Sequence, residues 1–160
     1  MIRSQKSTRR MVLLVFFAIS GLLQARCCPP YCANPLTPTT LDQFLTEGSY
    51  DEIITGTTAI IEQGEDAQYY ADALLYYGLA QMRMANVEEA AHYLDMAEQY
   101  SDQFTNGDYE LGRLYQGKMI VSAQLGDLDA AIHYRDMAIQ FAPELEEEIL
   151  KDAREYGIGE

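Results

Sequence analysis

Apolar residues recur every three to four positions through most of the chain after residue 40, which is the spacing of amphipathic helices. Turn residues such as Gly48, Asn86 and Gly126 separate these segments, and Pro143 precedes the last one. The predicted helices are 40–46, 49–64, 66–84, 87–100, 109–125, 128–142 and 144–157. The pattern therefore predicts an all-α fold of three helical hairpins, followed by an amphipathic helix that caps the last of them.

One segment of this pattern is duplicated. AHYLDMAEQY at 91–100 recurs as IHYRDMAIQF at 132–141, and seven of the eleven positions in 90–100 are identical to their counterparts in 131–141. A constant offset between similar helical segments is typical of stacked repeats, in which each unit buries its apolar face against its neighbours. The alanines that recur at close-contact positions predict a packing seam; they are Ala90, Ala97, Ala131 and Ala138.

The third hairpin resembles a tetratricopeptide repeat (TPR), a helix-turn-helix unit with a period of about 34 residues. Its second half carries the motif residues Gly126, Leu128, Ala131, Ala138 and Pro143, and the preceding hairpin carries Leu74, Tyr77, Gly78, Ala90, Leu94 and Ala97. Lys118, Met119 and Asp102 depart from the motif, and the longer spacing between Ala90 and Ala131 places an insertion near 101–108. The resemblance implies a short right-handed α-solenoid of about three TPR-like hairpins.

TPR proteins generally act as scaffolds that bind a partner protein in a concave groove lined by the first helices of successive repeats. Carried over by position, the resemblance implies a groove formed by Asp72, Leu75, Leu79, Arg83, Arg113, Gln116, Ile120 and Gln124. Arg83 and Arg113 would then suit an acidic partner. Alternatively, both arginines simply balance neighbouring Asp and Glu residues.

Charge is distributed unevenly along the chain. The segment 1–40 contains five basic and no acidic side chains, whereas the segment 41–160 contains all of the acidic side chains and only six basic ones. An acidic domain of this kind repels nucleic acid and anionic membrane surfaces, so no nucleic-acid partner is expected. The acidic side chains either form a solvated surface that keeps the domain soluble or face a basic partner.

Residues 1–26 have the layout of a secretory signal. Arg3, Lys6, Arg9 and Arg10 precede an uncharged, mostly apolar run, Met11–Leu23, which is shorter than the about 20 residues that a membrane-spanning helix needs. The segment is predicted to be a cleaved signal peptide or, alternatively, a retained N-terminal membrane anchor. Either case predicts export, with the helical domain periplasmic or membrane-associated and outside the cytoplasm.

A Cys/Pro-rich tether is predicted for residues 27–40. Four of the five prolines lie in it, and a segment so rich in proline favours an extended chain. Cys27 follows the signal as a lipoprotein acceptor would, although Arg26 and Gln24 depart from that pattern. The alternatives for Cys27, Cys28 and Cys32 are lipidation, which would hold the protein on a membrane, and a disulfide.

No catalytic site, metal site or cofactor is predicted. The chain has no Gly-rich phosphate loop after a strand, and neither histidine has a predictable nucleophile beside it. His92 and His133 occupy equivalent repeat positions, which indicates a duplicated surface position rather than a pair of metal ligands. Two functions follow: a non-catalytic scaffold or adaptor in the cell envelope, or a structural accessory subunit of a membrane complex held by its N-terminal segment or a lipidated Cys.

Overall fold

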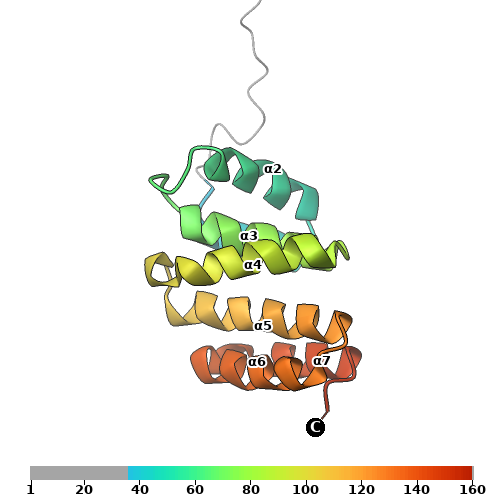
Figure 1. The fold of residues 1–160 in the computed structure, drawn as a ribbon. Helices are drawn as coiled ribbons and strands as arrows, with labels where there is room; N and C mark the ends of the chain where they lie inside the picture. The colour runs from blue at the N-terminus through green and yellow to red at the C-terminus, as the bar shows by residue number, and fades with distance from the viewer. Residues whose placement is uncertain (1–35, 160) are drawn as a thin grey trace, which may run out of the picture. The chain divides into compact units, whose positions relative to one another are not determined.

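A computed structural model describes residues 36–159 of the chain, and the regular structure of this part is helical throughout (Figure 1). Seven α-helices lie in residues 36–159, with two short 3₁₀ helices between them. In order they are α1 Pro38–Glu47, α2 Tyr50–Ile61, α3 Tyr70–Arg83, α4 Val87–Gln99, η2 Ser101–Gln103, α5 Asp108–Gln124, α6 Leu128–Phe141, η3 Pro143–Leu145 and α7 Glu146–Glu155. The predicted all-α class is confirmed for these residues.

The first helix begins earlier than the composition predicts. Thr37 caps α1 by accepting a hydrogen bond from the Thr40 amide, and Pro38 occupies the first helical position. Proline is favourable there because its fixed φ suits a helix and its missing N–H has no partner to lose. Residues 38–40 therefore belong to the helix and not to the predicted tether, whereas residues 27–35 lie outside the described part.

Successive helices pack in antiparallel pairs, and the most extensive contacts join α5 with α6 and α3 with α4. The turns that follow α3 and α5 lie at the same edge of the stack, which we call the turn edge (Figure 1). The predicted insertion between the second and third pairs contains η2 and an extended Phe104. Helix α7 packs on α5 and α6, and its Ile149 is fully buried.

The alanine seam predicted from the duplication is confirmed by burial. Ala90, Ala97, Ala131 and Ala138 have no exposed surface. Glycine allows an equally close approach between α5 and the end of α6, because a Cβ added at Gly112 would lie 2.2 Å from the Cβ of Ala142. Small residues at these positions let the helix axes come together and bury the larger side chains between pairs.

Candidate functional site

The predicted groove does not form an open surface in the structure. Leu75, Leu79 and Ile120 belong to the hydrophobic core, while Asp72, Arg113 and Gln116 are buried polar residues. Of the two remaining positions, Arg83 is half-buried and Gln124 is exposed. Six of the eight side chains are therefore buried within the folded chain. The reason is that helices and loops of the same chain, including α1 and α7, already pack against these first helices.

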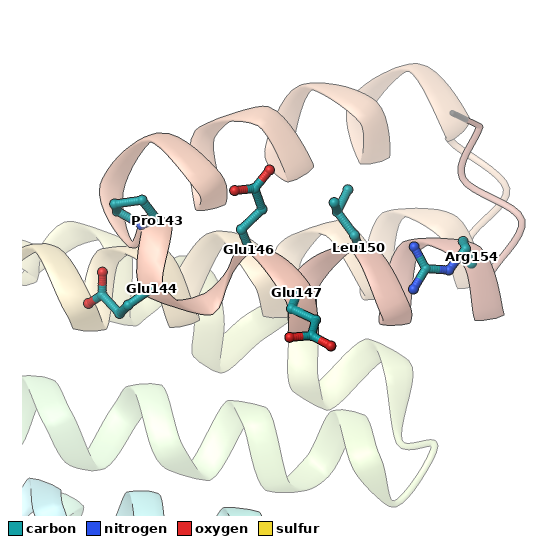
Figure 2. A pocket seen from close by; sticks show the side chains of 6 residues that line it. All are labelled: Pro143, Glu144, Glu146, Glu147, Leu150 and Arg154. Carbon is teal, nitrogen blue, oxygen red and sulfur yellow. The ribbon is translucent and has the colours of Figure 1, made fainter.

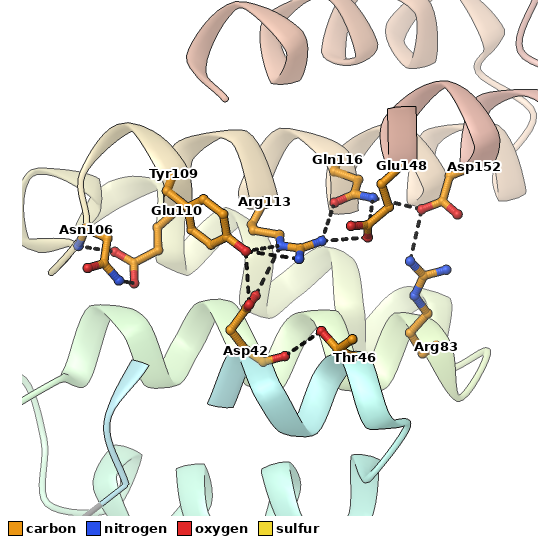
Figure 3. A network of polar contacts seen from close by, with 10 residues as sticks. All are labelled: Asp42, Thr46, Arg83, Asn106, Tyr109, Glu110, Arg113, Gln116, Glu148 and Asp152. Carbon is orange, nitrogen blue, oxygen red and sulfur yellow. Dashed lines mark hydrogen bonds and ion pairs between the residues drawn. The ribbon is translucent and has the colours of Figure 1, made fainter. Parts of the chain in front are cut away.

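Arg113 is the centre of this intrachain packing (Figure 3). Its Nε lies 3.2 Å from the Asp42 carboxylate of α1, and its Nη1 donates a 2.6 Å hydrogen bond to Glu148 of α7. The Tyr109 hydroxyl accepts hydrogen bonds from Arg113 and donates one of 3.0 Å to Asp42. One guanidinium on α5 thus holds both α1 and α7, and its donors are used within the chain.

Arg83 makes the second connection to α7. Its Nη2 donates a 2.9 Å hydrogen bond to Asp152, and the Gln116 amide donates to Asp152 and Glu148. Although burial opposes ionisation of Glu148, the Arg113 guanidinium and the Gln116 amide lower the pKa of this carboxyl below its usual value. Arg83 and Arg113, which were expected to suit an acidic partner, are therefore both paired with acidic residues of the chain's own last helix.

Two buried carboxyl groups, that of Asp72 on α3 and that of Glu110 on α5, lie beside each other. Asp72 accepts hydrogen bonds from the amide and hydroxyl of Thr105, and Glu110 accepts two from Asn106. Burial and the neighbouring Asp72 raise the pKa of Glu110 to about 7, while the hydrogen bonds from Asn106 limit the rise. The two carboxyl groups anchor the loop between α4 and α5, which gives them a structural role.

Lys118, which departs from the repeat motif, connects three helices. Its Nζ lies 2.8 Å from Asp95 and 2.5 Å from Glu98 on α4, and it also lies over the Tyr134 ring of α6. Asp95 belongs to the duplicated segment, and its counterpart Asp136 pairs instead with the adjacent Arg135. The duplicated aspartates thus have different structural partners.

The duplicated histidines are exposed, and each ring contacts the tyrosine that follows it in the same helix. Within residues 36–159 no group of three or more His, Cys, Asp or Glu side chains is arranged to hold a metal ion. Cys27, Cys28 and Cys32 lie outside the described residues, as does the apolar run at 11–23. None of the described helices is both long and apolar enough to cross a lipid bilayer.

The turn edge carries exposed apolar side chains that the groove hypothesis overlooked. Met84 is 43% exposed, Leu125 60%, Leu128 49% and Ile132 37%. Met84 and Leu125 occupy equivalent positions in the two repeats, at the ends of α3 and α5. Their neighbours are exposed acidic residues: Glu88, Glu89, Asp127 and Asp129. The repeat equivalence of Met84 and Leu125 is the sequence signal that could have identified this surface.

Comparison of the chain with protein-family models, with curated proteins and with solved structures found no match.

Proposed function

We propose that this protein is a non-catalytic, TPR-like scaffold or adaptor that binds a partner protein at its turn edge. The observation that carries the proposal is the exposure of Met84 and Leu125 at equivalent repeat positions. Large apolar side chains that gather on the surface of a soluble domain are typical of interaction sites. Arg83, Arg113 and Gln116, which the resemblance assigned to the groove, are paired with residues of α1 or α7, which favours the turn edge over the groove.

The charge around the turn edge defines the kind of partner. Exposed carboxylates flank the apolar side chains at the start of α4 and at the start of α6. A partner segment with apolar residues flanked by Lys or Arg complements this arrangement in both respects. The partner is therefore basic, in contrast to the acidic partner that Arg83 and Arg113 would suit if they were unpaired.

Export to the cell envelope is part of the proposal and rests on the signal-like layout of residues 1–26. The scaffold then binds its partner outside the cytoplasm. The accessory-subunit alternative also depends on those residues, or on a lipidated Cys27. Intact-mass measurement of the native protein separates the two, because cleavage near residue 26 removes the anchor and lipidation adds mass at Cys27.

The double substitution Met84→Ser and Leu125→Ser tests the binding surface. Both side chains are exposed, so stability should change by less than about 1 kcal/mol, while partner recovery in affinity purification from native membranes should fall at least tenfold. The matched control is Gln68→Ser with Gln103→Ser, since these exposed residues adjoin the loops at the opposite edge. Equal recovery with both double variants would exclude the turn edge as the binding surface.

A further inference from the structure

One side of α7 carries a self-complementary pattern. Glu146, Leu150 and Arg154 follow one another at every fourth position, so they lie on the same side of the helix in the order acidic, apolar, basic. If two such helices meet antiparallel across a two-fold axis at Leu150, each Glu146 faces the Arg154 of the other copy. The order of the three residues therefore allows two copies of α7 to form both ion pairs in a two-fold symmetric contact.

These side chains are available for contact. Glu146 and Arg154 are exposed, and Leu150 is half-buried. No ion pair found among residues 36–159 includes Glu146 or Arg154, whereas Arg83 and Arg113 are both paired. The charges of Glu146 and Arg154 are therefore not neutralised by ion pairs within residues 36–159.

This face is hollowed, and Figure 2 shows the side chains that line one of its depressions. Leu150 and Arg154 line two adjacent open pockets, so these side chains form a ridge with a depression on each side. One depression contains Pro143, Glu144 and Glu147; the other, between α6 and α7, contains Ile139, Ala153 and Ile158 together with the paired Arg135 and Asp136. The apolar part of the depression beside one Leu150 is a receptive surface for the Leu150 of a second copy.

We propose that this face, formed by α7 and the adjoining part of α6, binds a second copy of the chain with two-fold symmetry. Leu150 packs near the axis, and two Glu146–Arg154 ion pairs form on either side of it. Long-range repulsion between the two acidic domains opposes association at low salt. At about 0.15 M ionic strength the screening length is about 8 Å, so charges far from the contact contribute little to that repulsion.

Reciprocal charge reversal tests this arrangement. The full chain, in mild detergent and with reductant to prevent disulfides, is measured by sedimentation equilibrium at about 0.15 M salt. A dimer is expected, and Arg154→Glu or Glu146→Arg alone should weaken it at least tenfold, because each replaces two attractive contacts by two repulsive ones. The double variant Glu146→Arg with Arg154→Glu should restore dimerisation, because the two opposite charges face one another again.

Lys151→Glu is the matched control, because it changes the charge of α7 by the same amount at an exposed position outside the ridge. The control should leave the dissociation constant within about threefold. The proposal is overturned by a monomer at about 100 μM unaltered chain, by equal weakening with Lys151→Glu, or by failure of the double variant to restore the dimer. Association through the N-terminal segment would give equal masses for all variants and would also overturn it.

A crosslink provides the second measurement, because it does not depend on charge reversal. With Cys27, Cys28 and Cys32 replaced by Ser, Leu150→Cys places one thiol near the proposed axis in each copy. Oxidation should then link the copies at least tenfold more efficiently than in the matched Lys151→Cys chain. Equal crosslinking of the two would contradict the two-fold contact at Leu150.

Discussion

Glu110 has no exposed surface, and its carboxyl group lies beside that of Asp72. Burial disfavours the charged form of a carboxyl group, and a second carboxylate disfavours it further. The hydrogen bonds from Asn106 act in the opposite direction but do not cancel these effects. Because the pKa of Glu110 in the folded chain exceeds its ordinary value of 4.5, its ionisation destabilises the fold.

The pH dependence of stability follows from that sign. The contribution of Glu110 is fully present below about pH 4.5 and is lost as pH rises through about 7. Glu110→Gln cannot ionise, so relative to the unaltered chain this variant should gain roughly 1–3 kcal/mol of stability between pH 4.5 and pH 8. At pH 4.5 the variant should be the less stable of the two, because its amide nitrogen cannot accept one of the two hydrogen bonds that Asn106 donates to Glu110. Urea unfolding across this pH range measures the difference in the free energy of unfolding, and the exposed Glu155→Gln is the control. If the free energies of unfolding of Glu110→Gln and of the unaltered chain changed in parallel with pH, the predicted role of Glu110 would be contradicted.

At the scale of elements, equivalent turns close the second and third hairpins with different residues. Ala85 has φ 62° in the turn after α3, and Gly126 has φ 86° in the turn after α5. When Ala90 is aligned with Ala131, Ala85 is aligned with Gly126, so the two residues occupy the same position of the repeat. The backbone at this position is left-handed in both hairpins. Alanine adopts that conformation at a cost of about 1 kcal/mol, whereas glycine adopts it freely.

Ala85→Gly should therefore stabilise the chain, by up to about 1 kcal/mol, and Gly126→Ala should destabilise it by a similar amount. The flexibility that glycine adds to the unfolded chain reduces the gain from Ala85→Gly. Thermal unfolding followed by circular dichroism measures both changes. Opposite signs at the two equivalent positions are the expected result, and equal signs would show that backbone strain does not govern these turns.

At the scale of the whole described unit, Arg113 connects helices that are far apart in sequence. It lies on α5 and contacts Asp42 of α1 and Glu148 of α7, so one side chain joins the first and last helices of the described part (Figure 3). Removal of one member of a buried ion network leaves the others without compensation. Charge reversal at Arg113 would therefore impair folding, so a loss of binding in such a variant would not identify Arg113 as a binding residue.

Arg113→Met should cost about 2–4 kcal/mol, because it leaves the carboxylates of Asp42 and Glu148 without their cation. Amide hydrogen exchange should accelerate first in α1 and α7, whereas α3 and α4 should keep their protection. Lys151→Met is the control, since Lys151 is an exposed cation on α7. Uniform acceleration throughout the chain would show that Arg113 does not hold the two outer helices specifically.

Helical periodicity, turn residues and a duplicated segment are properties of local stretches of chain, so the amino-acid sequence was sufficient to locate the helices, their turns and the alanine seam. The start of α1 could not be predicted in this way, because a proline such as Pro38 is compatible both with an extended tether and with the first position of a helix. The buried positions of Ala90 and Ala138 followed directly from the repeat.

Only the tertiary structure decided what surrounds the first helices. The sequence placed Arg83 and Arg113 on one side of the repeats, but the identity of their partners depends on where α1 and α7 fold back. Those contacts join side chains of helices that are distant in the sequence, and helical periodicity carries no information about such long-range pairing. Burial of Arg113 by its own chain therefore became apparent only once the helices were packed.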